Sequence, residues 1–402
     1  MGIHRRTLAR KTTVIAVTGA SGKSTSVRYI AAALGLGGGR QMAFSTLHVS
    51  GSRSRFVRRS FRARELVIEV GIQRPGEMRP LVAGMRPDIA VVTAVGSGGE
   101  HAIAYRDAAH VAQEKGDLVR ALAPGGVAIL NGDDPLARQM AAIPGGPRIL
   151  FGFGEDNDVQ ATDFRLDWPN GSAFRVSARG QSAEVRTCLV GRVSAYPVLA
   201  AAAVALVRGR SLEQVAARVA GLEAIPGRLE IVRLPGDVVA IHDDYKGSLD
   251  SMHAALDVLE AAPAARKVLL LGDLDGPPDP ARPHYRAIGR RVAAIADHVL
   301  LAETNWKAYR AGLNEGGMTK DQYTRVQGIV AAAEALRAQL TPGSVVLVKG
   351  RQRARLYRAM LMLSGRDVSC TIERCPFTVQ ICERCRYLER GWHSPPPLTL
   401  RG

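Results

Sequence analysis

The sequence predicts two consecutive α/β domains followed by a short cysteine-rich tail. With 402 residues, the chain exceeds the size at which one hydrophobic core stops growing. Hydrophobic residues make up 46% of the chain but aromatic residues only 5%, which favours helix-covered parallel sheets over a β-sandwich. Buried-type strands also alternate with helical stretches twice along the chain. We therefore expect one domain over residues 1–225, a second over 226–365 and the tail over 366–402.

The first domain begins with a strand, a Gly-rich loop and a helix. Residues 12–17 form a short apolar run that ends in the loop, and residues 26–34 have helical character. Later segments continue the alternation, which predicts a parallel sheet with helices on both faces. These are strands at 66–70, 89–93 and 127–130, an antiparallel excursion within 159–190, and an Ala-rich helix at 195–208.

The second domain begins near Pro226-Gly227-Arg228, where turn residues interrupt the pattern. Four further strand candidates follow, separated by helical stretches, so we expect a Rossmann-like sheet. They lie at residues 238–242, 267–271, 298–301 and 345–348.

The Gly-rich loop reads Thr-Gly-Ala-Ser-Gly-Lys-Ser-Thr over residues 18–25. Between a strand and a helix, such a loop turns backbone N–H groups and the positive helix end toward a phosphate. Lys23 would neutralise the β- and γ-phosphates, and Ser24 would bind magnesium. Val17 replaces the first Gly of the general pattern, so the loop is a variant form. We predict ATP binding by Gly19, Ala20, Ser21, Gly22, Lys23, Ser24 and Thr25.

The formal net charge of +17 favours an acidic partner. Charge alone fits a nucleotide, a nucleic acid, a polyanionic substrate or a membrane surface. The stretch from Arg53 to Arg64 interleaves two Phe with basic residues, as in a solvated basic loop or a nucleic-acid-binding segment. Neither a membrane-spanning run nor a signal peptide is evident, so we expect a cytoplasmic protein.

Four of the five cysteines lie in the last tenth of the chain, at Cys370, Cys375, Cys382 and Cys385. Their clustering argues against a disulfide framework spread over the fold. Four thiolates that end in a Cys-Glu-Arg-Cys knuckle suit tetrahedral zinc. An iron–sulfur cluster and unliganded reduced thiols are the alternatives.

The variant loop resembles that of the Mur ligases and the folylpolyglutamate synthetases. Further segments extend the resemblance over residues 11–365, and their order is most similar to the D-alanyl-D-alanine-adding branch. They are Glu69-Val70-Gly71, Glu100-His101, Lys115-Gly116-Asp117, Asn131-Gly132-Asp133-Asp134, Pro226-Gly227-Arg228-Leu229-Glu230, Asp243-Asp244-Tyr245, Leu271-Gly272-Asp273 and Val348-Lys349-Gly350.

The resemblance implies an ATP-dependent ligase that activates a carboxylate as an acyl phosphate and couples it to an amine. Glu69 and His101 would hold a second magnesium together with Lys115, which the family typically carries as a carbamate. The segment Asp243-Asp244-Tyr245 would hold the ribose and base of the nucleotide. Arg228 and Lys349 would approach the phosphate or the incoming acid.

Two departures from the family limit what is expected of the substrates. The phosphate-loop strand begins almost at the start of the sequence, where the cell-wall branch carries a UDP-sugar domain. Val193, Ser194 and Pro197 stand where the family has adenine-binding His and Asn residues, and Lys246-Gly247 lacks the usual Asn residues. We therefore expect a small, peptidyl or carrier-borne acid in place of a UDP-muramyl substrate, with an amino acid or another amine as its partner.

The alternative function is a scaffold or nucleic-acid-associated protein that keeps the ATPase fold without ligase activity. The basic stretch and the cysteine tail would then be surfaces for nucleic acid or a partner protein. Retention of Glu69, His101 and Lys115 together favours the enzyme, because a scaffold needs no second metal site.

Overall fold

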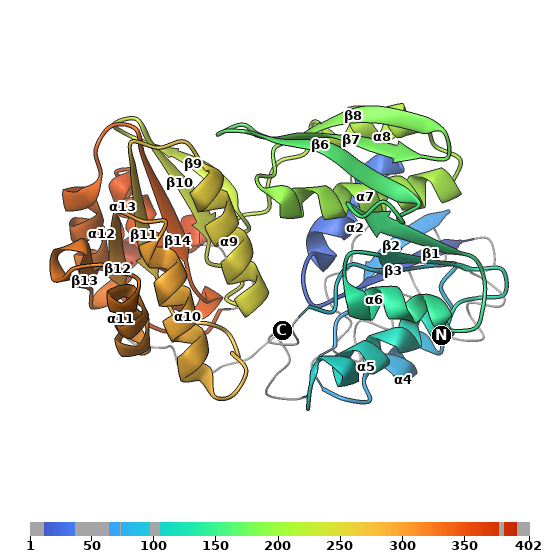
Figure 1. The fold of residues 1–402 in the computed structure, drawn as a ribbon, viewed down its shortest axis with the longest axis horizontal. Helices are drawn as coiled ribbons and strands as arrows, with labels where there is room; N and C mark the ends of the chain where they lie inside the picture. Colours follow the sequence, from blue (N-terminus) through green and yellow to red (C-terminus); the bar gives the residue numbers. More distant parts are fainter. Residues whose placement is uncertain (1–11, 37–63, 73, 97–104, 378–381, 392–402) are drawn as a thin grey trace. The chain divides into compact units, whose positions relative to one another are not determined.

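The computed structural model describes residues 12–36, 64–72, 74–96, 105–377 and 382–391, and it divides the chain into two compact units (Figure 1). The first unit ends at Glu223. The second begins at Ala224 and includes the described part of the tail, together with two short segments from the first half of the chain. Both units are α/β, as the sequence predicted.

The first unit is built on a sheet whose described strands run in the order β2-β1-β3-β4-β5-β6-β7-β8. The pairs from β2 to β6 are parallel, whereas β6, β7 and β8 pair in antiparallel fashion. This confirms the predicted parallel sheet and its antiparallel extension. The bounds are β1 (Thr13–Thr18), β2 (Glu65–Glu69), β3 (Ile89–Val92), β4 (Val127–Asn131), β5 (Arg148–Gly152), β6 (Val159–Asp167), β7 (Gly171–Ala178) and β8 (Gln181–Thr187).

Helices cover both faces of this sheet (Figure 1). The helices α4 (Met78–Val82), α5 (Ala108–Arg120) and α6 (Pro135–Gln139) join one core cluster with side chains of the parallel strands. On the other face, α2 (Lys23–Ala33) packs against α7 (Ala195–Val207) and α8 (Leu212–Val219). Because α7 is rich in Ala, its neighbours approach closely, and most of its residues are buried. Short 3-10 turns lie at Met140–Ala142 and Arg192–Ser194.

The second unit has a sheet whose described strands run in the order β13-β12-β11-β14-β10-β9. All pairs are parallel except the edge pair β9–β10. The bounds are β9 (Glu230–Leu234), β10 (Val238–Asp243), β11 (Arg266–Leu271), β12 (His298–Leu301), β13 (Tyr323–Arg325) and β14 (Ser344–Lys349).

The helices of the second unit separate into two groups. On one side lie α12 (Gly328–Gln339) and α13 (Arg358–Leu363), which join a core cluster with β10, β11 and β14. On the other side lie α9 (Leu249–Ala261), α10 (Ala281–Ala293) and α11 (Trp306–Glu315), with contacts between neighbours (Figure 1). The chain therefore leaves β11 and β14, which are adjacent, toward opposite faces. Open α/β sheets bind ligands at such a switch point, at the carboxyl ends of the strands. The tail adds α14 (Tyr387–Arg390), and 3-10 turns lie at Lys320–Gln322, Gln352–Ala354 and Cys382–Arg384.

Three strands were missing from the predicted set, namely β5, β9 and β13. Two of them carry weak local signals: β13 has only three residues, and β9 is an edge strand with little fully buried surface. The first helix also begins at Lys23, three residues earlier than predicted, because Gly22 adopts a left-handed conformation that allows the loop to enter the helix at once.

Candidate functional site

The phosphate loop connects β1 to α2, and two of its glycines are required by its shape. Gly22 has φ of +77°, in the left-handed region that other residues rarely adopt. A Cβ atom on Gly19 would lie only 2.0 Å from Thr93 Oγ1, which no side chain tolerates. The loop therefore keeps a bare backbone that can approach phosphate groups closely.

The residues that directly follow β3 hold this loop by hydrogen bonds. The hydroxyl of Thr93 donates to the carbonyl oxygen of Ser21 at 2.6 Å and lies 3.2 Å from that of Thr18. The backbone N–H of Ala20 donates to Ala94 O at 2.7 Å. The loop is thus held by both strands that border it.

Lys23 lies over its own loop. Its Nζ donates to Gly19 O at 2.7 Å and to Ala20 O at 3.1 Å. The ammonium group therefore already lies against the loop, where the phosphates of a nucleotide would replace the two carbonyl oxygens as partners.

The segment Asn131-Gly132-Asp133-Asp134 fixes the loop that follows β3. Asn131 Nδ2 donates to Thr93 O at 2.8 Å. Asp134 accepts from the backbone N–H groups of Val95 and Gly96 at 2.8 and 2.9 Å, and its other oxygen caps α6. This segment therefore supports the phosphate loop indirectly, through the residues around Thr93.

Asp133 is hydrogen-bonded to the segment around Tyr196, where the adenine-binding side chains of the family are absent. It accepts hydrogen bonds from Phe153 N at 2.6 Å and from Tyr196 Oη at 3.0 Å, among others. Burial alone would raise the pKa of Asp133, but these bonds lower it below its usual value. The guanidinium of Arg192 lies 3.6 Å from the centre of the Phe153 ring. An aromatic and guanidinium cluster therefore occupies this place.

Two of the predicted magnesium-site residues are buried in the first unit. Glu69 ends β2 beside Val17 of β1 and is 6% exposed. Lys115 lies in α5, which packs against β1 and β3, and it is fully buried. Charged side chains are rarely buried to this extent unless they are paired. His101 lies outside the described residues, so its part in the predicted ligand set stays a prediction.

In the second unit, the turn Pro226-Gly227-Arg228 is joined to the segment Asp243-Asp244-Tyr245. Leu229 N donates to Asp243 Oδ1 at 3.0 Å, and Tyr245 N donates to Gly227 O at 3.1 Å. The guanidinium of Arg228 lies 4.5 Å from the centre of the Tyr245 ring. The two segments therefore form one surface at the carboxyl end of β10.

Lys349 holds this surface from inside. It is fully buried, and its Nζ lies 2.7 Å from Asp243 Oδ2 and 3.0 Å from Ser251 Oγ, with a further bond to Lys246 O. Its ammonium joins the carboxyl ends of β14 and β10. The expectation that Lys349 reaches a phosphate stays a prediction, and its contacts here favour a positioning role.

His242 forms a charged relay that the sequence analysis did not identify. Its Nδ1 lies 2.9 Å from Glu230 Oε2, and its Nε2 lies 2.7 Å from Asp244 Oδ1. Burial by itself would lower the pKa of His242, but the two carboxylates raise it to about 9. The ring stacks on Tyr357 with centroids 3.6 Å apart. A buried imidazolium therefore braces the Asp244 loop.

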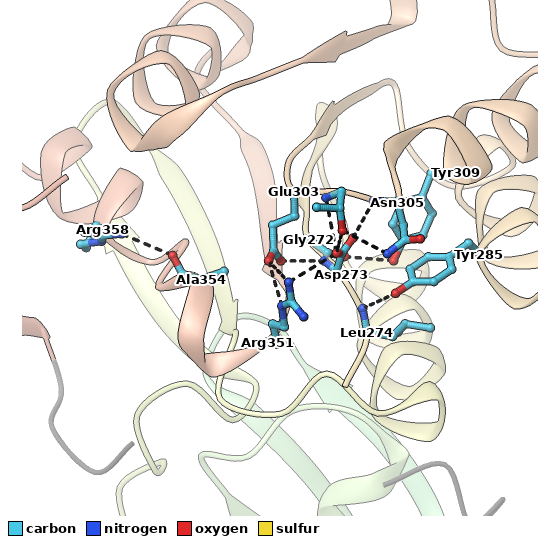
Figure 2. Close-up of polar contacts among 11 residues, drawn as sticks. Gly272, Asp273, Leu274, Tyr285, Glu303, Asn305, Tyr309, Arg351, Ala354 and Arg358 are labelled. Atoms are coloured by element: carbon cyan, nitrogen blue, oxygen red, sulfur yellow. Dashed lines mark hydrogen bonds and ion pairs between the residues drawn. The ribbon is translucent and has the colours of Figure 1, made fainter. Parts of the chain in front are cut away.

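A second polar cluster lies at the carboxyl ends of β11, β12 and β14 (Figure 2). Glu303 accepts from Asp273 N at 2.8 Å and from Arg351 Nε at 2.8 Å. Asp273 accepts from Asn305 N at 3.0 Å and lies 3.5 Å from Arg351 Nη2. Burial raises the pKa of Glu303 above its usual value, against the lowering effect of Asp273 N–H and Arg351. The two carboxylates are 2% and 14% exposed and the guanidinium 26%, so Arg351 is the accessible member.

Three glycines lie together beside this cluster. A Cβ atom on Gly247 would lie 3.2 Å from Gly350 O, and one on Gly272 would lie 2.7 Å from Glu303 Oε2. A side chain at either position would crowd its neighbours, and the glycines leave the backbone bare at the switch point between β11 and β14.

The four cysteines of the tail line one small cavity together with Arg355, Arg358 and Leu388. Among the described residues, however, no group of three or more His, Cys, Asp or Glu side chains is arranged to hold a metal ion. The predicted zinc site is therefore not supported. Cys370 and Cys375 instead pack with Ile372 as a small apolar cluster, and Arg358 Nη1 lies 3.3 Å from Cys370 Sγ.

Two further expectations concern binding to nucleic acid and to a membrane. Residues 53–63 of the basic stretch lie outside the described part of the chain. In the portions that are described, none of the helices has the length and apolarity needed to span a bilayer.

Comparison with protein families assigns both units. The model of the Mur ligase middle domain matches residues 17–205, and the model of the Mur ligase glutamate ligase domain matches residues 227–352. The first match lies mainly in the first unit, and the second match lies in the second unit.

Two relatives that are similar to this chain share one name. UDP-N-acetylmuramoyl-tripeptide–D-alanyl-D-alanine ligase from Mycobacterium tuberculosis is 29% identical over 86% of this chain and 71% of the relative. The Escherichia coli enzyme of the same name is 30% identical over 65% of this chain and 58% of its own length.

Solved structures agree in fold. A crystal structure of MurF from Acinetobacter baumannii has a TM-score of 0.77 at 23% identity and covers 91% of this chain and 79% of its own. The MurF ligase of Thermotoga maritima in complex with ADP has a TM-score of 0.74 at 17% identity and covers 90% of this chain and 83% of its own.

Proposed function

The chain belongs to the Mur ligase family and is an ATP-dependent ligase that forms amide bonds; from that premise we propose that it couples a small, peptidyl or carrier-borne acid to an amino acid or another amine. The observation that carries the proposal is the phosphate loop, fixed by Thr93 and accompanied by buried Glu69 and Lys115. No comparison supports the alternative of a scaffold without ligase activity.

The reaction divides into two balanced steps. A carboxylate oxygen attacks the γ-phosphorus of ATP, and the bond from that phosphorus to the bridging oxygen breaks. ADP is released and an acyl phosphate is formed. The amine nitrogen then attacks the acyl carbon, the C–O bond to phosphate breaks, and the nitrogen loses a proton. The products are the amide, ADP and inorganic phosphate.

The residues of the first unit fit the first step. The loop N–H groups and Lys23 would hold the β- and γ-phosphates and offset their growing negative charge. Mur ligases use magnesium, which prefers hard oxygen ligands, and the Ser24 hydroxyl and the buried Glu69 carboxylate are donors of that kind. Bound there, magnesium would neutralise phosphate charge. Lys115, as a carbamate, would add a further anionic oxygen ligand.

The second unit fits nucleotide positioning and acceptance of the amine. Tyr245 and Arg228 would contact the nucleotide from the surface that Asp243 and Asp244 hold in place. The bare backbone beside Gly272 and the accessible guanidinium of Arg351 would accept the amine substrate (Figure 2). A free carboxylate on that substrate would pair with Arg351, so an amino acid or peptide is favoured over a simple amine.

The names of the relatives suggest the first acceptor to try, D-alanyl-D-alanine. We include it in a panel of amino acids, dipeptides and simple amines. The acids to test are peptides, UDP-linked muramyl peptides and carrier-borne carboxylates.

The test is phosphate release from ATP that requires both an acid and an amine. We expect Lys23→Ala to abolish release and Lys320→Ala, a matched change at an exposed turn, to preserve it. Release that ignores the added acid and amine, or that survives Lys23→Ala, would contradict the proposal.

A further inference from the structure

Residues beyond the family-matched region dock on the second unit. The glutamate ligase domain model ends at residue 352, yet Leu356, Tyr357 and Leu388 join one core cluster with side chains of β10, β11 and β14. Polar contacts then hold the tail to the residues that directly follow position 352. Arg358 Nη1 donates to Cys370 O at 2.7 Å, Arg355 Nη2 donates to Phe377 O, and Cys375 N donates to Arg353 O at 2.9 Å. The tail is therefore part of the unit and not a separate module.

Tyr357 links this tail to the proposed nucleotide surface. Its hydroxyl donates to Glu383 Oε1 in the tail at 2.6 Å. Its backbone N–H donates to Asp244 Oδ2 at 3.0 Å, and its ring stacks on His242 at an interplanar angle of 8°. One residue thus contacts the tail, the Asp244 carboxylate and the imidazolium that braces it.

The same residues surround a small cavity at the carboxyl end of β10. Gly227, Asp244 and Tyr245 contribute one side, and Tyr357, Cys382 and Glu383 contribute another. Because ligands of open α/β sheets gather at this edge, a change in the tail reaches the place where binding is expected.

We propose that Glu383 and Tyr357 are positioning residues through which the tail sets the Asp244-Tyr245 loop for nucleotide binding. The inference rests on the proposed role of this loop in holding the nucleotide. It predicts that tail residues far along the chain change nucleotide affinity without touching the nucleotide themselves.

Four single variants of the full chain, together with the double variant Glu383→Ala/Tyr357→Phe, test this relay. Glu383→Ala and Tyr357→Phe each remove the same hydrogen bond, and the second keeps the stacked ring. Glu383→Gln keeps an oxygen that accepts from the Tyr357 hydroxyl. Glu389→Ala is the control, because it breaks an exposed tail ion pair with Arg366 that lies outside the relay. The readouts are the dissociation constant of ADP by calorimetry and the midpoint of thermal unfolding.

Loss of this part-buried hydrogen bond should weaken ADP binding by about 5-fold in Glu383→Ala and in Tyr357→Phe. The double variant should be no weaker than either single variant, since both act on one contact. Glu383→Gln and Glu389→Ala should bind within about 2-fold of the wild type. A purely structural role would lower the unfolding midpoint of the first two variants and leave ADP affinity unchanged, which would overturn the proposal.

The same titrations separate this inference from the proposed function. Unchanged affinity in Glu383→Ala, with binding lost in Lys23→Ala, would reject the tail relay and leave the ligase assignment intact. ADP binding that is absent in the wild type, or insensitive to Lys23→Ala, would reject the proposed nucleotide site and the relay with it.

Discussion

The hydroxyl of Thr93 donates a 2.6 Å hydrogen bond to the carbonyl oxygen of Ser21 and so ties the end of β3 to the middle of the phosphate loop. Thr93→Val keeps the shape of the side chain but removes this bond. We expect ATP to bind about 10-fold more weakly, because the loop must be ordered when the nucleotide arrives. Calorimetry with ATP measures the effect, and Thr162→Val on β6 is the control. Equal affinity in both variants would show that the loop holds its shape without Thr93.

Lys115 is fully buried in α5, where a charged side chain is costly for stability. Lys115→Met replaces it with an apolar side chain of similar length. We expect the midpoint of thermal unfolding to stay the same or rise, while acid- and amine-dependent phosphate release falls by about 100-fold. Arg120→Met, an exposed position at the end of the same helix, should change neither quantity. A loss of stability together with activity would indicate a structural role for Lys115.

Arg351 shares its guanidinium between Glu303 and Asp273 (Figure 2). Arg351→Met would leave two largely buried carboxylates without their cation, so we expect the free energy of unfolding to fall by about 3 kcal/mol in urea denaturation. Adding Glu303→Gln removes one of the unpaired charges and should restore part of the loss. If the double variant has a lower free energy of unfolding than Arg351→Met, the unpaired carboxylates are not the cause of the lost stability.

The sequence was sufficient to identify segments in which neighbouring residues carry the signal. The phosphate loop and the segment Asp243-Asp244-Tyr245 each combine local pattern with residue chemistry, and each lies at the end of a strand as predicted. Burial of Glu69 at the end of β2 also agrees with the pattern of that strand. Long periodic segments are the part of a fold that local sequence determines best.

Contacts between distant segments were not predictable in the same way. Thr93 and Ser21 are 72 residues apart, and Arg351 and Asp273 are 78 apart. No local pattern marks such a pair, because the sheet order brings the residues together. The cysteine spacing in the tail suggested zinc, but spacing does not show that Arg358 donates to Cys370. The contacts of the tail cysteines depend on how the tail packs against the rest of the unit, which their spacing does not show.

His242 makes the stability of the second unit depend on pH. Its pKa is raised from 6.5 to about 9 by Asp244 and Glu230, so the folded state binds its proton more tightly than the unfolded state does. The stabilisation is fully present below pH 6.5 and is lost as pH rises through about 9, with a size on the order of 3 kcal/mol. The pKa of Asp244 is lowered, so its own contribution is lost only in acid.

We therefore expect the free energy of unfolding to fall between pH 6.5 and pH 9.5 in denaturant titrations of the wild type. In His242→Gln most of this fall should disappear, because Gln carries no proton that the carboxylates can retain. His284→Gln, on α10, should keep the full pH dependence. If the wild type and His242→Gln lose the same stability over this range, His242 does not bind its proton more tightly in the folded state, and the charged relay beneath Asp244 is absent.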